Sequence, residues 1–313
     1  MSEGGSSHRG RRSVLGAIAG SAAGLSGIAG CLSGRERIQV LAATSLTVAL
    51  EEQIGPAFES ETGIRVDGEY HGTNALTRMV EEGRIHPDVV IGVDPGLVRD
   101  RLSPDRIGWD VEFATNELVI VYALDTELGT RLEAGDRWYE VLRDADAGAV
   151  GIGDPDRSPL GYRALHLFEL AEREHDVPGF LETMTERVRV DGGDGQLLGG
   201  VDAGARACAI AYRNMAADRG LPSLSLPDVY SFGNPAYEDE YARATHTTST
   251  GRTIPGSPVV YNATVPTGAD AVEIGERFVS FLLERTALLE EAGFRVPAPI
   301  PRRYGAVPEG IVP

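Results

Sequence analysis

Short apolar runs alternate with amphipathic stretches along most of this chain, and this alternation constrains the fold more than any other feature. Residues 38–43 are apolar and rich in β-formers, whereas residues 46–59 repeat apolar side chains at helical spacing. The same pattern predicts strands at residues 64–69 and 88–93, with a helix over residues 74–83 between them. Strands that alternate with helices favour a parallel sheet covered by helices. We therefore predict an α/β protein.

A second block of the same kind begins at residues 117–122, whose continuous apolar character suits a strand that crosses between two lobes. Further strands and helices are expected at residues 150–153, 162–173, 207–212 and 214–219. A strand over residues 257–265 and two C-terminal helices return to the first lobe. We predict lobe 1 from residues 38–118 and 258–313, lobe 2 from residues 119–257, and a ligand cleft between the lobes.

The first 31 residues have the pattern of a targeting segment. Arg11 and Arg12 precede a run of small and apolar residues that ends at Cys31. The arginine pair resembles a twin-arginine export signal, and residues 28–31 resemble a lipobox whose cysteine receives lipid. A single membrane-spanning anchor is the alternative, although the stretch is Gly/Ala-rich and short for a spanning helix. We expect an exported protein that is attached to the outer face of the cytoplasmic membrane through Cys31.

The charge of the chain is strongly negative. It carries 47 acidic and 29 basic residues, for a formal net charge of -18, and every basic residue is arginine. Such a balance argues against a nucleic-acid partner. Self-repulsion of this size is screened at about 1 M salt, where the Debye length is roughly 3 Å. The composition therefore suggests a halophilic protein, with an ordinary acidic protein as the alternative.

Hydroxyl side chains precede two of the expected helices in lobe 1. Ser45, beside Thr44, precedes the helix at residue 46, and Thr73 precedes the helix at residue 74. Each follows the C-terminal end of a strand, where open α/β sheets bind ligands. Helix starts present free N–H groups and the positive end of the helix dipole, which suit an anion. The alternative is that both residues are ordinary N-caps.

Two further helix starts are expected in lobe 2. One follows residues 154–162, which include Asp156 and Ser158, and the other follows Ala211 and Tyr212. Four sets of neutral donors that converge from both lobes would enclose a tetrahedral oxyanion. Neutral donors suit a dianion because they avoid the desolvation of a buried counter-cation, which costs several kcal/mol. Arg78, Arg163 and Arg213 could steer an anion or pair with acidic neighbours.

Several motifs match a known family over about residues 38–297. The chain resembles the archaeal tungstate/molybdate-binding proteins of ABC transporters and, more distantly, the bacterial molybdate-binding proteins. The matching segments are residues 42–47, 71–75, 87–94, 154–163, 212–213, 226–228, 233–238, 256–261 and 278–283. The segment at residues 154–163 is the most specific of them.

The resemblance implies a two-lobed type II periplasmic-binding-protein fold that closes on one oxyanion and delivers it to an ABC permease and its ATPase. Ser45 and Thr73 fall on the family's hydroxyl positions. The archaeal group supplies two carboxylates to the metal, and these positions correspond here to Ser158 and Ala211. We therefore expect an intact tetrahedral anion held by hydrogen bonds. An alignment shifted by two residues would place Asp156 at one carboxylate position.

No motif of an enzyme or of a metal site stands out. The histidines are scattered without zinc spacing, and neither a nucleophile elbow nor a phosphate-binding loop occurs. Asp88 and Asp94 bracket a buried strand, where capping is the simpler role. We predict a monomeric binding protein without catalytic activity, metal or other cofactor. A protein of the same fold for another small oxyanion, such as sulfate, is the alternative, and an enzyme on a similar frame is the third hypothesis.

Overall fold

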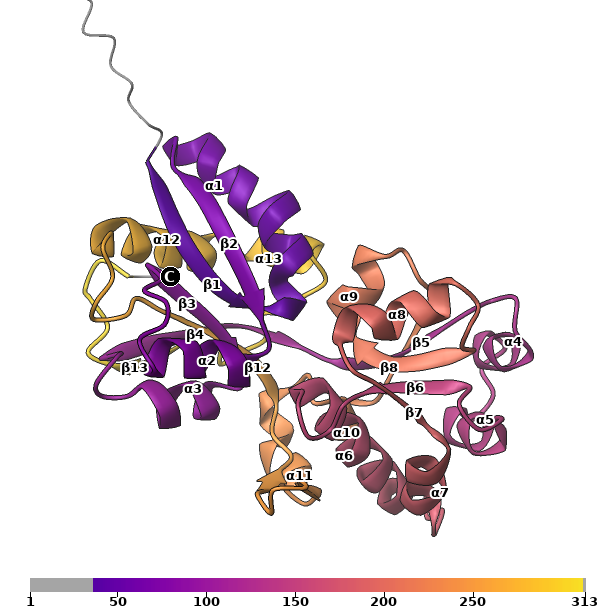
Figure 1. Ribbon diagram of the computed structural model, residues 1–313. Helices are drawn as coiled ribbons and strands as arrows, with labels where there is room; N and C mark the ends of the chain where they lie inside the picture. Colours follow the sequence, from indigo (N-terminus) through magenta and orange to yellow (C-terminus); the bar gives the residue numbers. More distant parts are fainter. Residues whose placement is uncertain (1–35, 312–313) are drawn as a thin grey trace, which may run out of the picture. The chain divides into compact units, whose positions relative to one another are not determined.

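The computed structural model describes residues 36–311, except for the side chains at positions 194 and 195. The predicted export signal and lipidation site at Arg11, Arg12 and Cys31 lie outside these residues. Two sheets with helices on their faces organise the described part (Figure 1). We call the six-stranded sheet and its helices lobe 1, and the five-stranded sheet and its helices lobe 2. The predicted two-lobed α/β fold is confirmed.

The sheet of lobe 1 has the strand order β13-β4-β12-β3-β1-β2. These strands are β1 (Arg37–Ala43), β2 (Arg65–His71), β3 (Val89–Val93), β4 (Trp109–Asn116), β12 (Val259–Thr264) and β13 (Arg302–Gly305). The helices of the lobe are η1 (Thr44–Leu46), η2 (Ala49–Ile54), α1 (Gly55–Thr62), α2 (Thr73–Glu81), α3 (Pro95–Leu102), α12 (Val272–Glu284) and α13 (Thr286–Glu291). The C-terminal helices thus belong with the first strands of the chain, as Figure 1 shows by their colours.

The sheet of lobe 2 has the strand order β7-β6-β8-β5-β9. These strands are β5 (Leu118–Tyr122), β6 (Val150–Gly153), β7 (Arg189–Asp191), β8 (Cys208–Tyr212) and β9 (Ser223–Ser225). The helices are α4 (Glu127–Glu133), α5 (Trp138–Asp144), α6 (Pro159–Glu174), α7 (Phe180–Arg187), α8 (Asp194–Asp202), α9 (Arg213–Asp218), α10 (Asp228–Ser231), η3 (Pro235–Tyr237) and α11 (Glu238–Tyr241). A separate hairpin pairs β10 (Thr245–Thr247) with β11 (Thr253–Pro255).

Both faces of the lobe 1 sheet are covered at its centre, which explains why β3 is apolar along its whole length. Val40 belongs to a core cluster with Phe58 of α1 and Phe278 of α12, whose rings meet edge to face at 5.0 Å. The next residue, Leu41, belongs to a second cluster with Leu76 of α2. Successive side chains of a strand point to opposite faces, so β1 contributes to both clusters.

The sheet of lobe 1 is mixed, which corrects the prediction of a parallel sheet. β1 is parallel to β2 and β3, but β12 is antiparallel to both β3 and β4. The reason is the chain path: β4 leads out of lobe 1 at Asn116, and β12 returns beside it at Val259, the partner of Asn116. A strand that comes back from the other lobe at this edge must run in the opposite direction.

The helix expected over residues 46–59 is present, but it passes from η1 through the π-helix η2 into α1 without interruption. The π-helix ends with the Gly55 N–H bonded to the Leu50 carbonyl oxygen. A Cβ at position 55 would lie 2.5 Å from that oxygen, so glycine permits this close approach. The tail after residue 296, which is Pro-rich and shows little periodicity, contributes β13 to the sheet edge.

Within residues 36–311, none of the helices combines the length and the apolar character that crossing a membrane would require.

Candidate functional site

The largest of the hollows that we consider lies between the lobes and has a volume of about 720 Å³. We call it the interlobe cleft. Its lining from lobe 1 comprises Thr44, Gly72, Asn74, Ala75, Arg78 and Arg101. Its lining from lobe 2 comprises residues 154–158 with Tyr162, Gly192, Gly193, Thr248, Thr250, Arg252 and Ile254. Three residues predicted from sequence, Thr44, Asp156 and Ser158, therefore meet at one surface from both lobes.

Ser45 lies in η1, directly after the C-terminal end of β1, and is 7% exposed. Its Oγ is 2.9 Å from the Tyr261 hydroxyl oxygen, and its carbonyl oxygen accepts a hydrogen bond of 2.5 Å from the Asn214 side-chain amide. Ser45 forms no helix cap through its side chain. Ser45 is not among the residues that line the interlobe cleft. It lines a second hollow of about 320 Å³, and the adjacent Thr44 lines both this hollow and the cleft.

Thr73 is the first residue of α2 and is fully buried, so Gly72 occupies the N-cap position that was expected for Thr73. Its Oγ1 accepts a hydrogen bond of 3.2 Å from the Val93 N–H, which ties the start of α2 to the end of β3. The lining of the interlobe cleft includes the neighbours Gly72 and Asn74 but not Thr73. The first N–H groups of α2, which lack partners within the helix, are the donors that this segment can offer.

The helix expected from residue 162 begins earlier, at Pro159, so Ser158 is the N-cap of α6, and its Oγ accepts a hydrogen bond of 3.2 Å from the Leu160 N–H. The preceding loop lies tightly against the first turn of this helix. A Cβ on Gly161 would come within 2.4–2.6 Å of the Asp154 and Pro155 backbone. Glycine at this position therefore lets the loop hold Ser158 at the start of a 16-residue helix.

Asp156 is exposed in the same loop, and its carboxylate accepts a hydrogen bond of 2.9 Å from the Ser249 N–H. The Ser249 backbone N–H is the main cause that lowers the pKa of Asp156 below its ordinary value, and His246, 3.9 Å away, adds to the effect. The carboxylate is thus an ionised acceptor that binds the loop after β10. It contributes negative charge to the cleft wall.

Ala211 and Tyr212 lie at the C-terminal end of β8, buried within the sheet. Ala211 pairs with Val119 of β5, and its side chain is fully buried. The Tyr212 hydroxyl accepts a hydrogen bond of 3.1 Å from the Arg163 guanidinium. Neither residue is among those that line the interlobe cleft.

A buried polar network next to Ser45 could not be identified from the sequence. The Asn116 amide donates to the Asn214 Oδ1 at 2.7 Å and lies 3.4 Å from the Tyr261 hydroxyl. All three side chains are 0% exposed. Burial raises the pKa of Tyr261, so its hydroxyl keeps its proton. The network fixes η1 of lobe 1 against α9 of lobe 2. In the sequence these residues appear only as isolated polar side chains among apolar ones, a pattern that does not reveal their contacts.

A direct bond between the lobes joins Asp94 to Tyr162. The Tyr162 hydroxyl donates to the Asp94 Oδ2 at 3.1 Å, while Oδ1 of the same carboxylate caps α3 through the Leu97 N–H. The expected capping role of Asp94 is therefore present together with a second role across the cleft. Asp88 bonds to the N–H groups of Gln39 and Ala271 and joins elements within lobe 1.

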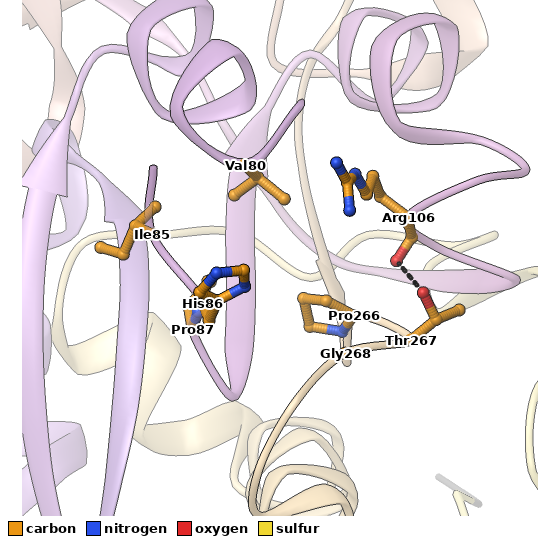
Figure 2. A pocket seen from close by; sticks show the side chains of 8 residues that line it. All are labelled: Val80, Ile85, His86, Pro87, Arg106, Pro266, Thr267 and Gly268. Carbon is orange, nitrogen blue, oxygen red and sulfur yellow. Dashed lines mark hydrogen bonds between the residues drawn. The ribbon is translucent and has the colours of Figure 1, made fainter. Parts of the chain in front are cut away.

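A small hollow of about 100 Å³ lies at the opposite edge of the lobe 1 sheet (Figure 2). Its walls are formed by Val80, Ile85, His86, Pro87, Arg106, Pro266, Thr267 and Gly268. These residues precede β3 or β4 or follow β12, at the strand ends away from Ser45. Thr267 donates to the Arg106 carbonyl oxygen there, and none of the predicted site residues takes part.

Among residues 36–311, His, Cys, Asp and Glu side chains form no group of three or more that could hold a metal ion. The absence of a metal cofactor stays a prediction. Beside the carboxylates of Asp154 and Asp156, the cleft offers a ligand hydroxyls, helix N-termini and arginines, and these last three bind anions by hydrogen bonds.

Comparisons with known proteins agree with the sequence motifs. Residues 38–295 match the family described as bacterial extracellular solute-binding proteins. An uncharacterized solute-binding protein of Halobacterium salinarum is 41% identical over 96% of this chain and 97% of its own length. A Haloferax volcanii protein with a provisional name, ABC transporter molybdenum-binding protein, is 36% identical over 95% of both chains. A molybdate/tungstate-binding protein of Pyrococcus abyssi is 29% identical over 91% and 93%.

A solved structure has the same fold. The periplasmic molybdate-binding protein of Azotobacter vinelandii superposes with a TM-score of 0.60 at 17% identity, covering 83% of this chain and 99% of its own. At this identity the similarity concerns the fold alone. The predicted resemblance to archaeal proteins that bind molybdate or tungstate is confirmed by the relatives.

Proposed function

The chain belongs to the bacterial extracellular solute-binding proteins, and on this basis we propose that it captures a molybdate- or tungstate-type oxyanion between its lobes for an ABC importer. One observation carries the proposal. Hydroxyl residues at strand ends and the N-termini of α2 and α6 border one cleft from opposite lobes. The names of the archaeal relatives support the choice of ligand.

The proposed ligand donors are neutral. Ser45 and Thr44 contribute hydroxyls, and the first turn of α2 at Thr73 contributes N–H groups; Ser158 and the first turn of α6 contribute the same kinds of donor from lobe 2. Partial charges at two helix starts favour a dianion without a cation in direct contact. The cleft is larger than one such anion, so binding would draw the lobes together by hinge closure.

The anion is proposed to stay tetrahedral. Expansion of the metal's coordination would need carboxylates that reach it, but Ser158 and Ala211 stand at the corresponding positions. Asp156, which an alignment shifted by two residues would place at one of these positions, is bonded to the Ser249 N–H. The side chain of Ala211 is buried in the sheet. Ala211 and Tyr212 would then contribute only by fixing the position of β8 next to the site, without contact to the anion.

Export and attachment through Cys31 are proposed from the twin arginines and the lipobox alone. In this account the protein is a monomeric receptor that releases the anion to a permease driven by an ATPase. It uses no metal or other cofactor, catalyses no reaction and has no nucleic-acid partner. The net charge of -18 supports a setting of high salt.

Titration calorimetry of the purified protein in concentrated salt tests the ligand. We expect saturable one-to-one binding of molybdate and tungstate, and affinities for sulfate and phosphate that are weaker by at least about tenfold. If sulfate binds more tightly than molybdate and tungstate, the cleft is still an oxyanion site, but its ligand is sulfate, which is the alternative that the sequence left open. Failure of all four anions to bind would contradict the proposed function.

A further inference from the structure

Arg163 is a charged side chain that the fold buries completely, at 0% exposure, in the second turn of α6. Its guanidinium donates to the Tyr212 hydroxyl at 3.1 Å, to the Ser257 carbonyl oxygen and Oγ at 3.3 Å, and to the Pro258 carbonyl oxygen at 3.3 Å. All these acceptors are neutral. Within residues 36–311, Arg163 forms no ion pair within 4 Å.

A buried cation with neutral partners differs from two partly buried arginines of the described residues, Arg206 and Arg99. Arg206 pairs with Asp191, and Arg99 pairs with Asp110 and Glu112. Removing a charge from water costs several kcal/mol unless an opposite charge offsets the loss. The hydrogen bonds of Arg163 satisfy its N–H groups but leave its charge without a contact partner.

The carboxylate that acts on Arg163 from a distance is Asp94, and Tyr162 lies between them. The Tyr162 hydroxyl donates to Asp94 at 3.1 Å, and the Arg163 guanidinium carbon is 5.5 Å from the centre of the Tyr162 ring. Tyr162 lines the interlobe cleft. The wall of the cleft at this point therefore has one buried positive charge behind it from lobe 2 and one negative charge from lobe 1.

Arg163 is also connected to the proposed donor Ser45. It donates to the Tyr212 hydroxyl, and that group is near enough to Tyr261 to raise the pKa of Tyr261 further, after the main effect of burial. The Tyr261 hydroxyl in turn bonds to the Ser45 Oγ. Because these groups are buried, salt screens the field of Arg163 much less than that of exposed arginines.

We propose that Arg163 is the buried counter-charge that makes the cleft prefer a doubly charged over a singly charged tetrahedral anion, and that Asp94 opposes it. The inference rests on the proposed function and deepens it, because it concerns how the same site selects its ligand. Arg163 acts here as a positioning and charge-selecting residue that does not touch the anion. The two charges predict opposite effects when each is removed.

The test compares molybdate with perrhenate, a tetrahedral monoanion of similar size, by titration calorimetry in concentrated salt. The readout is the ratio of the perrhenate to the molybdate dissociation constant. Arg163→Met should lower this ratio by about tenfold, since one unit of charge interaction with the ligand is lost. Asp94→Asn should raise it by about threefold to tenfold.

Three features keep the comparison interpretable. Asn retains a cap oxygen for the Leu97 N–H and tolerates the positive φ of 79° at position 94, so Asp94→Asn tests the proposal even if Arg163→Met does not fold. Arg37→Gln, at the end of β1 away from Ser45, removes an exposed cation and should leave the ratio unchanged. If Arg163 has only a structural role, Arg163→Met should weaken the binding of both anions by the same factor and leave the ratio unchanged.

An unchanged ratio in folded Arg163→Met, or a ratio that Asp94→Asn lowers, would overturn the inference while leaving the proposed function intact. A wild-type protein that binds neither anion would overturn both.

Discussion

Replacing Gly161 by alanine should destabilise lobe 2 and weaken oxyanion binding together. The new Cβ would lie 2.4–2.6 Å from the Asp154 and Pro155 backbone, closer than packed atoms can approach. Either the loop or the first turn of α6 must move, and forced repacking of this kind costs about 1–3 kcal/mol. The movement displaces Ser158, so we expect the dissociation constant for molybdate to rise by at least about tenfold.

Thermal unfolding and titration calorimetry measure the two effects. Gly199→Ala in α8 is the matched control, because a Cβ there meets nothing within 4 Å. Alanine inside a helix is favoured over glycine by about 0.5–1 kcal/mol, so this control should be neutral or slightly stabilising and should bind as wild type does. Wild-type affinity in folded Gly161→Ala would show that the loop at residues 154–158 does not position the ligand.

Replacing Ser45 by alanine should weaken binding by about 1–3 kcal/mol, the loss of a buried hydrogen bond to a charged group. The Tyr261 hydroxyl loses its 2.9 Å partner in the same variant but keeps the Asn116 amide at 3.4 Å. Stability should therefore fall less than affinity. Ser60→Ala on the exposed surface of α1 is the control, and it should change neither quantity.

The comparison of Ser45→Ala with its control separates a ligand contact from a structural contact. Equal affinity of wild type and Ser45→Ala for molybdate would remove Ser45 from the proposed site. A large loss of stability without loss of affinity would assign Ser45 to the buried network around Asn116 and Asn214 alone.

Sequence patterns predicted the elements that are apolar along their whole length. β3 and β5 are buried on both faces, so their sequences are unbroken apolar runs, and these runs predicted the two strands correctly. The helix after residues 154–158 was also predicted, but from residue 162, whereas α6 already begins at Pro159, a residue type that suits the first helical position. These features depend on residues that are close in the sequence, where local physical chemistry decides the outcome.

Features that depend on distant residues could not be predicted in this way. Thr73 has the residue type of an N-cap, but the Val93 N–H binds its hydroxyl from another strand, and Gly72 is the cap. Arg163 had two possible roles in the sequence, and only its burial against residues 257–258 distinguishes it from an arginine on the surface. Likewise, β13 forms because the edge of β4 is free to pair, which the irregular tail does not reveal.

The most direct test of the central claim is a crystal structure of the protein with tungstate, with the metal located by its anomalous scattering. We predict one strong peak in the interlobe cleft, within reach of hydrogen bonds from Ser45 and Ser158 through four ligand oxygens, with no carboxylate oxygen bound to tungsten. A peak bonded directly to a carboxylate such as Asp156 would contradict tetrahedral binding. A peak only at the hollow around His86 and Arg106, or no peak at all, would contradict the cleft as the site of capture.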